Sequence, residues 1–453
     1  MSELIKGRRF YLAVLVIILM IPSNARVLAA EKMVKSGTTL QEMINNAQTG
    51  DIVKVKKGLY KESIVISKPL TLIAEEGVII DGGGNGSVIT ITADGVGVSG
   101  FAIQNSGKAK DDSGIVLKGV NGALIEANKM TNVLYGIYSE NSSNNTIKNN
   151  EISSFPTHFS KRGNGIHLYK GKGNLVENNK IVNVQDGIYF DFTMNSQIQQ
   201  NIVKDSRYGF HFMFSEAIIV EENFIQKNIT GFMVMDSKNL QFIRNEIVDQ
   251  FHFRGVGVLL YDVDNIVLEE NEIQQNSSGL YFEKARNTHI KRNIIAANQV
   301  GLQFKGENEG NILRENNFIG NAVQSKIANH NMRLDDNEMG NYWDDYNSFD
   351  LTGDGIGEIP YKAGSIYDQI LQKYPHWQFY FESPAIKIWN KAESMFPSIG
   401  TANVYDEKPL VEPVKLAENM KMKEAKTTIS TLFIGLLLIA SSLFIIVKGR
   451  RMG

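Results

Sequence analysis

A spacing between glycine and asparagine recurs along most of this chain. In eight copies a glycine followed by an apolar residue lies fourteen residues before an asparagine, and most copies start 22 residues after the previous one. The pairs are Gly114/Asn128, Gly136/Asn150, Gly165/Asn179, Gly187/Asn201, Gly209/Asn223, Gly231/Asn245, Gly257/Asn271 and Gly279/Asn293, and a ninth pair, Gly301/Asn317, is two residues longer. A fixed period of this length predicts a solenoid, in which similar coils stack on one another.

The pattern within each unit selects the kind of solenoid. A unit of 22 residues is too short for two helices and a turn, and runs such as Phe-His-Phe-Met-Phe at 210–214 alternate with the period of a strand. Recurring asparagine and glycine suit left-handed turns and stacked amide side chains. The sequence therefore predicts an all-β fold, a right-handed parallel β-helix. Positions one and three after each glycine face its interior and positions two and four face outward.

The ends of the chain differ in composition from this repeat. Residues 1–30 have the basic start, apolar stretch and small-residue end of a signal peptide. Residues 31–113 are expected to form an N-terminal cap with a short helix near 39–47 and the first coils, 114–325 the regular coils, 326–383 a C-terminal cap and 384–426 a linker. Residues 427–447 form an uncharged apolar run long enough for one transmembrane helix, and the basic tail at 448–453 places the C-terminus inside. We expect a β-helix outside the cytoplasmic membrane and anchored to it.

Composition excludes several functions. The chain has no cysteine, which rules out a disulfide framework, a thiolate metal site and a cysteine nucleophile. Its formal net charge of −2 implies no general attraction to nucleic acid.

The outward positions carry an unusual set of side chains. Stacking the coils places His211 and Met213 beside Met233 and Met235, with His167 and Met194 nearby on the same array. Imidazole and thioether groups together select soft, monovalent copper, Cu(I). The alternative of equal weight is an apolar stripe that docks a partner protein.

Two further features are weaker. The longer steps in the repeat add loops with exposed aromatic residues around His158 and His252, where functional residues are often found, although tolerated insertions explain them equally well. The spacing of Asp350 and Asp354 hints at a calcium loop, and a hydrogen-bonded turn is at least as good an explanation.

The main alternative function is an extracellular carbohydrate-binding or carbohydrate-active protein of the lyase or epimerase type. Such enzymes need clustered carboxylates on one face. Asp186, Asp191, Glu216, Glu221 and Glu222 are available, but Asp186 precedes the glycine at the turn, and acidic residues at repeat turns are usually solvated. No carboxylate pair stands out on the outward face, so we expect no enzymatic activity.

Several of these runs resemble the NosD family of accessory proteins for nitrous-oxide reductase maturation. The resemblance covers about residues 38–380, and its most specific part is the His-Phe-Met-Phe-Ser run at 211–215 with Met-Asp-Ser one coil later, at 235–237. Asp-Gly-Ile-Tyr at 186–189 and Asn-Tyr-Trp-Asp-Asp-Tyr at 341–346 add to it.

The resemblance implies a non-enzymatic role in denitrification. A family member of this kind would receive copper from a NosL-like chaperone outside the membrane and pass it to nitrous-oxide reductase. It would work with an ABC transporter made of a NosF-like ATPase and a NosY-like permease. The predicted membrane helix departs from the soluble periplasmic members of the family.

Overall fold

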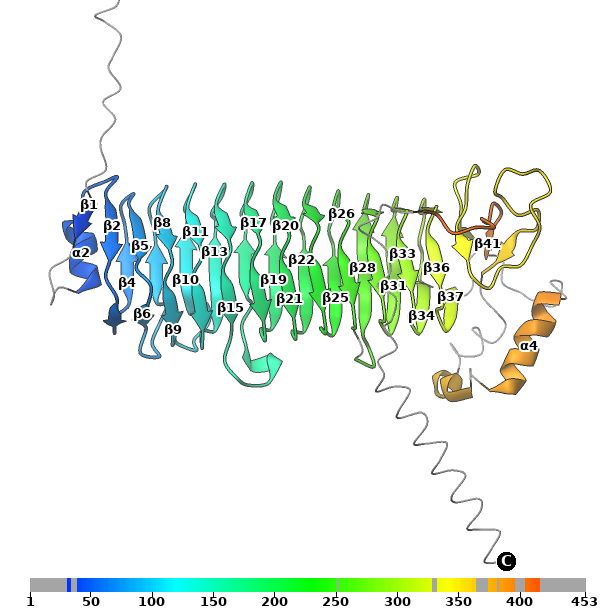
Figure 1. The fold of residues 1–453 in the computed structure, drawn as a ribbon, viewed down its shortest axis with the longest axis horizontal. Helices are drawn as coiled ribbons and strands as arrows, with labels where there is room; N and C mark the ends of the chain where they lie inside the picture. The colour runs from blue at the N-terminus through cyan, green and yellow to red at the C-terminus, as the bar shows by residue number, and fades with distance from the viewer. Residues whose placement is uncertain are drawn as a thin grey trace, which may run out of the picture. The chain divides into compact units, whose positions relative to one another are not determined.

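The computed structural model describes residues 31–33, 39–250, 252–327, 332–363, 374–380, 383–395 and 404–415. By Cα proximity the chain divides into two units, Met1–Glu412 and Pro413–Gly453. The described part of the first unit is a parallel β-helix with a cap at each end (Figure 1). The predicted fold class is therefore confirmed for these residues.

Each coil consists of three strands, one in each of three parallel sheets that we call sheets I, II and III. Sheet I contains thirteen strands in the described ranges: β1 (Glu31–Met33), β2 (Ile52–Val55), β5 (Thr71–Ala74), β8 (Gly97–Ser99), β11 (Leu124–Glu126), β14 (Thr146–Lys148), β17 (Leu175–Glu177), β20 (Gln197–Gln199), β23 (Ile219–Glu221), β26 (Gln241–Ile243), β29 (Val267–Glu269), β32 (His289–Lys291) and β35 (Ile312–Arg314).

Sheet II has the longest strands, and the repeated glycines lie at their starts. Over the described residues its twelve strands are β4 (Ile64–Ile66), β7 (Ile89–Ile91), β10 (Ser113–Lys118), β13 (Tyr135–Glu140), β16 (Ile166–Tyr169), β19 (Asp186–Asp191), β22 (Tyr208–Met213), β25 (Thr230–Met235), β28 (Val256–Asp264), β31 (Ser278–Arg286), β34 (Val300–Lys305) and β37 (Val323–Ile327).

Sheet III follows the repeated asparagines and completes each coil. Its thirteen strands in the described part of the chain are β3 (Gly58–Tyr60), β6 (Val78–Asp81), β9 (Ala102–Gln104), β12 (Lys129–Thr131), β15 (Glu151–Ser153), β18 (Lys180–Val182), β21 (Ile202–Lys204), β24 (Phe224–Gln226), β27 (Glu246–Val248), β30 (Glu272–Gln274), β33 (Ile294–Ala296), β36 (Asn317–Ile319) and β39 (Tyr342–Trp343).

The interior is built from the inward positions of sheet II and their equivalents in the other sheets. Phe190 and Phe212 are fully buried and stack across adjacent coils with 4.4 Å between ring centroids. Phe210 and Phe232 stack in the same way at 5.3 Å. Burying each ring stabilises the fold by roughly 2–3 kcal/mol, so the core grows with every coil.

The repeated glycines are required by close packing between coils. A Cβ on Gly209 would lie 2.4 Å from Cγ2 of Ile225 and 2.6 Å from the carbonyl oxygen of Gly231, closer than real contacts allow. None of the nine repeated glycines has a positive φ, whereas the residue before the asparagine in each of the first eight pairs has one, such as Gln200 at 56°. The expectation that these glycines supply left-handed turns is therefore wrong, because their role is steric.

The repeated asparagines form a buried ladder, as predicted. The side-chain amide of Asn201 donates to Oδ1 of Asn223 at 3.0 Å, and its Oδ1 accepts the backbone N–H of Asn179 at 3.0 Å. In the ninth unit the ladder passes from Asn293 to Asn316 at 2.9 Å, and not to the predicted Asn317. Each amide thus satisfies buried backbone groups at a turn where no strand pairing is available.

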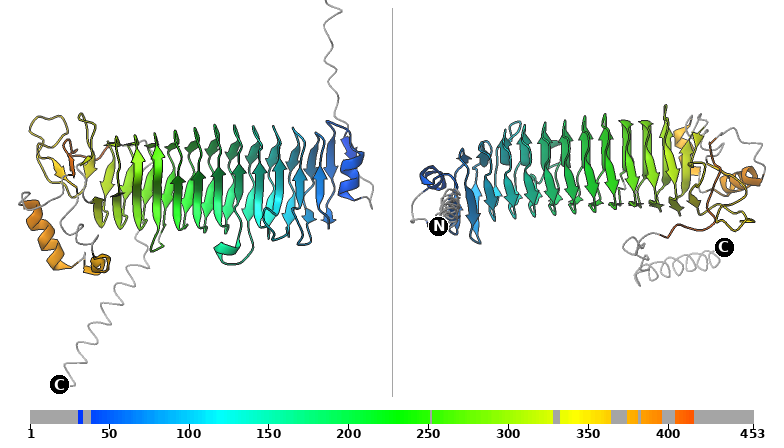
Figure 2. Two further views of the ribbon diagram at one scale, coloured as in Figure 1. Left: turned by 180° about the vertical axis from the view of Figure 1, so that it is seen from behind. Right: turned by 90° about the horizontal axis from the view of Figure 1, so that it is seen from above.

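The N-terminal end is closed by the predicted helix. Helix α2 (Leu40–Asn46) starts at a capping box between Thr39 and Glu42, and it buries Leu40, Met43 and Ile44 against the first coil. Figure 2 shows this helix lying across the end of the stack. The cap covers apolar surface and strand edges that the first coil would otherwise expose.

The C-terminal end is closed by a small sheet of β38 (Met332–Arg333), β41 (Val404–Asp406) and β40 (Tyr361–Lys362). Trp343 stacks on Phe318 of the last coil at 4.1 Å and donates its indole N–H to the carboxylate of Asp406 at 2.9 Å. Burial raises the pKa of Asp406 to about 6. The structure thus differs from the expected linker over 384–426, because β41 and the residues after it belong to the cap.

The other helices in the described part of the chain are short. They are η1 (Phe159–Lys161), η2 (Pro375–Tyr380) and α4 (Pro384–Met395). The predicted signal peptide at 1–30, the predicted membrane helix at 427–447 and the tail at 448–453 lie outside the described residues. Within the ranges that the structure does describe, every helix is too short or too polar to cross a bilayer.

Candidate metal-binding site

The outward stripe of sheet II has the register that the repeat predicts. His211 on β22 pairs with Met233 on β25, and Met213 pairs with Met235. The four side chains therefore occupy neighbouring outward positions on adjacent strands, which lie about 4.8 Å apart in such sheets. His211 is 7 % exposed, and the three methionines are partly buried.

The stripe continues toward the N-terminus as a column of rings. His211 stacks on Tyr189 with 4.4 Å between centroids, and His167 lies 4.5 Å from the same tyrosine ring. Tyr138 meets His167 edge-on at 5.1 Å. Tyr189 also donates its hydroxyl to the sulfur of Met213 at 3.1 Å. The ring of Tyr189 thus separates the two imidazoles and contacts a thioether.

The proton of neutral His211 can be placed from its partner. Nδ1 lies 3.0 Å from Oδ2 of Asp186, and a carboxylate accepts hydrogen bonds, so Nδ1 carries the proton. Nε2 then carries a lone pair, and this atom is buried without a hydrogen-bond partner among the described residues. Histidines that bind metals commonly have this arrangement, in which a carboxylate orients the ring from behind.

Asp186 is the residue that sequence reasoning misjudged. It is 1 % exposed rather than solvated, and it forms a two-point ion pair with Arg207 at 2.8 and 2.7 Å. Burial alone would raise its pKa, but the hydrogen bonds from His211 and Arg207 outweigh burial and lower it. One signal was available: Arg207 lies one coil later and one position earlier in its repeat, within reach of Asp186.

His167 is mostly buried and has no polar partner at either ring nitrogen in the described structure. Burial lowers its pKa to about 4, so the ring is neutral at physiological pH. Two buried nitrogens without hydrogen bonds are uncommon, and such atoms often mark an absent water or ion. This residue therefore has the electronic state that a ligand requires.

Met194 lies apart from the stripe. It sits on the turn after β19, is 42 % exposed, and forms isolated bridges with Lys172 and Glu216 of the neighbouring coils. Beside it in sequence, Phe192 stacks on Phe214 at 4.8 Å, and both rings are exposed. The structure brings His211, Met213, Met233 and Met235 together, whereas Met194 belongs to an exposed apolar patch at the strand ends.

The two irregular loops meet over one depression of about 700 Å³, which both His158 and His252 line. Figure 1 shows the loop with η1 projecting beyond the turns of neighbouring coils. Nδ1 of His158 accepts the backbone N–H of Ser160 at 3.4 Å, and Nδ1 of His252 accepts that of Arg254 at 3.3 Å. In each of these rings the Nδ1 lone pair is therefore already engaged by a backbone N–H group, whereas Nε2 of His211 has no such partner among the described residues.

The possible calcium loop is a hydrogen-bonded turn. Asp350 accepts the backbone N–H groups of Gly353 at 2.6 Å and Gly355 at 2.9 Å, and Asp354 accepts that of Ile356 at 3.0 Å. These bonds lower the pKa of Asp350. No group of three or more His, Cys, Asp or Glu side chains suited to a metal occurs in the described ranges.

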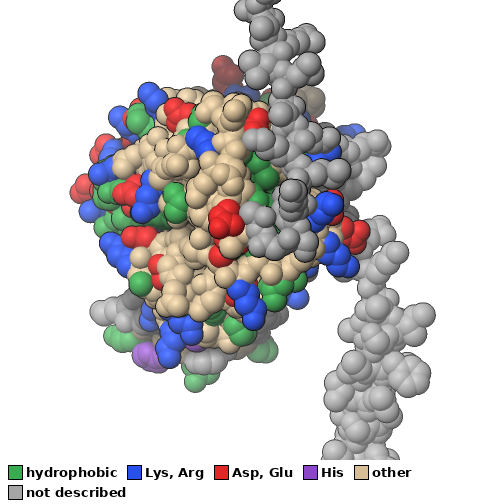
Figure 3. Space-filling model, turned by 90° about the vertical axis from the view of Figure 1, so that its left-hand side faces the viewer, with side chains coloured by type: hydrophobic (Ala, Val, Ile, Leu, Met, Phe, Trp, Pro, Cys, Tyr) green, Lys and Arg blue, Asp and Glu red, His purple; other side chains and the backbone are tan. Residues whose placement is uncertain are grey.

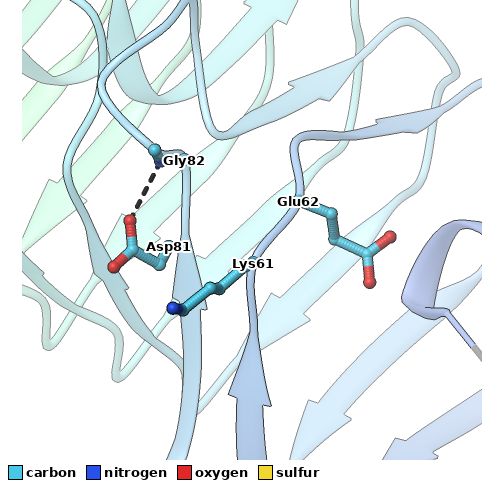
Figure 4. A pocket seen from close by; sticks show the side chains of 5 residues that line it. Lys61, Glu62, Asp81 and Gly82 are labelled. Carbon is cyan, nitrogen blue, oxygen red and sulfur yellow. Dashed lines mark hydrogen bonds between the residues drawn. The ribbon is translucent and has the colours of Figure 1, made fainter. Parts of the chain in front are cut away.

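Elsewhere, charged side chains serve the fold. A hollow of about 230 Å³ near the first coils is lined by Lys61, Glu62, Asp81 and two glycines (Figure 4). Its carboxylates accept backbone N–H groups, Glu62 those of α2 and Asp81 that of Gly83. On the face seen from the N-terminal end, both signs of charge are interspersed (Figure 3). The described residues visible on this face form no single-sign patch of the kind that attracts nucleic acid.

The fold and the site define a parallel β-helix whose outward stripe offers imidazole and thioether donors in place of paired carboxylates. The family model NosD, described as "Periplasmic copper-binding protein (NosD)", matches residues 152–348, a range that contains all six candidate residues. The chain is 32 % identical over 373 residues to a "Probable ABC transporter binding protein NosD" of Pseudomonas aeruginosa, covering 78 % of this chain and 86 % of that protein. It is 30 % identical over 381 residues to the protein of the same name from Stutzerimonas stutzeri, with 79 % and 86 % covered.

This chain therefore belongs to the NosD family. Among solved structures, the A-module of the mannuronan C-5 epimerase AlgE6 of Azotobacter vinelandii is similar with a TM-score of 0.51. It shares 13 % sequence identity, and the match covers 62 % of this chain and 88 % of that one. At this identity the likeness reflects the β-helix fold alone. The NosD relatives are named as binding proteins, which agrees with the expectation of a non-enzymatic role.

Proposed function

We propose that this protein binds Cu(I) on the outer side of the cytoplasmic membrane and passes it toward the copper centres of nitrous-oxide reductase. The observation that carries the proposal is the buried Nε2 lone pair of His211, whose proton is held on Nδ1 by Asp186. Membership of a family described as periplasmic and copper-binding supports it.

The ligand atoms at the site suit monovalent copper. Met213, Met233 and Met235 supply thioether sulfurs and His211 supplies a neutral imidazole nitrogen, the ligand types that favour soft monovalent copper over hard cations. Thioethers also persist in an oxidising compartment where free thiols are lost. Because Nε2 is buried, neighbouring side chains must move to admit the ion. We propose that the flexible methionine side chains form this entrance. His167 would extend the path along the column of rings, and Met194 would extend it onto the turn after β19.

The names of the relatives support a proposal for the partners. The relatives are named for an ABC transporter, and we propose that a NosF-like ATPase and a NosY-like permease act with this protein. In this scheme a NosL-like chaperone delivers the copper, and apo nitrous-oxide reductase receives it. Residues 1–30 would direct export, and residues 427–447 would hold the β-helix near the permease.

An anaerobic Cu(I) titration of the full-length protein against a competing chelator tests the proposal. The key variant is Met213→Leu/Met233→Leu/Met235→Leu, which keeps side-chain volume and removes the sulfurs. The matched control is Met130→Leu, at a fully buried core position of sheet III. We expect tight binding in the parent and the control and a loss of at least a hundredfold in the triple variant. Equal affinity in all three proteins would refute the site.

A further inference from the structure

A buried ion pair lies directly behind the proposed copper ligand. Both oxygens of Asp186 accept hydrogen bonds from Arg207, Oδ1 from Nε and Oδ2 from Nη2. Oδ2 also accepts a hydrogen bond from Nδ1 of His211. The Asp186 side chain is 1 % exposed and that of Arg207 is 30 % exposed. The carboxylate is thus cut off from water, and the guanidinium closes it from the outside.

Arg207 is held in this position by its own packing. Its guanidinium carbon lies 4.3 Å from the ring centroid of Tyr208, and Tyr208 in turn packs edge-on against His211 at 5.1 Å. The cation is therefore part of the same cluster as the imidazole. Its planar fork matches the carboxylate, so both Asp186 oxygens are engaged and the negative charge is neutralised.

The consequence for a bound cation is electrostatic. With the Asp186–Arg207 pair neutral, the imidazole and the three thioethers contribute no net charge. An uncompensated buried carboxylate would attract a divalent ion twice as strongly as a monovalent one, and it would offer a hard oxygen ligand. A second carboxylate, Asp191, pairs in register with Met213, but it is only partly buried and keeps contact with water.

We infer that Arg207 sets the charge selectivity of the site: by neutralising the buried Asp186 carboxylate, it makes the site favour Cu(I) over divalent cations. This inference rests on the proposed copper site. Asp186 orients the His211 ring, and Arg207 neutralises the negative charge that the Asp186 carboxylate would otherwise add to the site. Arg207 is therefore a specificity-determining residue that does not itself contact the metal.

The test compares Cu(I) and Co(II) binding in the parent and in Arg207→Gln. Cu(I) is titrated anaerobically against a chromophoric chelator, and Co(II) is followed by its visible absorption. We expect the ratio of Co(II) affinity to Cu(I) affinity to rise at least about tenfold in the variant. The ratio is the informative quantity, because a general weakening of the fold lowers the affinity for both ions.

Three further variants separate the explanations. Arg244→Gln removes an arginine whose partners, Glu221 and Glu222, are on the surface, and it should leave the ratio unchanged. Arg207→Gln/Asp186→Asn removes the uncompensated charge and should restore the parental ratio. Arg207→Leu keeps apolar packing over Tyr208 and serves as the replacement if Arg207→Gln folds poorly. We expect the same rise in the ratio of Co(II) affinity to Cu(I) affinity in this variant.

The outcomes are distinct. If the parent does not bind Cu(I), the proposed copper site itself is refuted. If the parent binds Cu(I) but both Arg207 variants keep its ratio, the copper site stands and the selectivity role of Arg207 is overturned. A raised ratio that persists in the double variant also overturns it, because Asp186 is then not the source of the added attraction.

Discussion

His211 and His167 occupy the same outward column, yet their surroundings give the two imidazoles different chemistry. His211 has a carboxylate on Nδ1 and a free lone pair on Nε2. His167 has no polar partner in the described structure and is surrounded by the rings of Tyr135, Tyr138 and Tyr189. The first ring is oriented for one ligand, whereas the second is kept neutral mainly by burial.

The state of His167 predicts a pH dependence of stability. Its pKa is about 4 in the folded protein and near the ordinary 6.5 when unfolded, so the unfolded chain binds more protons between these values. Stability should therefore fall, by on the order of a few kcal/mol, as the pH drops from 6.5 to 4. We expect urea unfolding midpoints of His167→Phe to fall less over this range than those of the parent. His289→Gln, at an exposed position, should behave like the parent, and identical curves for all three proteins would contradict the assignment.

The sequence was enough to predict the side chains that could bind the metal, but not the environment of the Asp186–Arg207 pair that orients His211. The period of the repeat determines which outward residues are neighbours, so the square around His211 and Met233 could be predicted by counting. The same counting places Arg207 within reach of Asp186, but it could not show that this pair is buried, because burial at positions before the glycine depends on the packing of two coils. The protonation states of the histidines depend on the same local contacts.

At the scale of the element, the asparagine ladder holds the turn between sheets I and III. Each amide supplies hydrogen bonds at the turn: that of Asn201 bonds backbone groups of Asn179 and Val176 on the preceding coil and of Gln199 on its own coil. The sequence predicted this stacking because asparagine recurs at one position. It could not show that glycine recurs for close approach, because spacing alone does not distinguish steric need from a left-handed conformation.

Loss of one amide from the ladder should lower the stability of the fold substantially. Asn201→Ala leaves the backbone N–H of Asn179 and the carbonyl of Val176 without their partners in a dry interior. At about 1–3 kcal/mol for each of the two buried groups left unsatisfied, we expect a loss of about 2–6 kcal/mol in the free energy of unfolding. Gln197→Ala, four positions earlier on an exposed site, should change it by less than about 0.5 kcal/mol. Equal effects in chemical denaturation would show that the ladder does not stabilise the coil.

At the scale of the whole β-helix, each coil contacts its sequence neighbours, and the ends are closed by unrelated structures. Helix α2 was predictable from its position and amphipathic pattern. The C-terminal cap was predictable only in part, because β41 reaches it from a charged, aperiodic stretch that carries no repeat signal. Long-range returns of this kind are decided by tertiary contacts such as the bond between Trp343 and Asp406.

This one-dimensional arrangement predicts that damage to the cap stays local. Asp406→Ala removes the acceptor for the indole of Trp343 and for the backbone N–H of Asn341, both buried. We expect amide hydrogen exchange to quicken at least tenfold in residues 332–363 and in β36, while β19, β22 and β25 keep their protection and Cu(I) affinity is unchanged.

Gly209→Ala is the matched contrast, because its clash lies in the coil of His211 and should impair both protection and copper binding there. Loss of copper binding in Asp406→Ala would mean instead that the coils unfold as one cooperative unit and that the site depends on the distant cap.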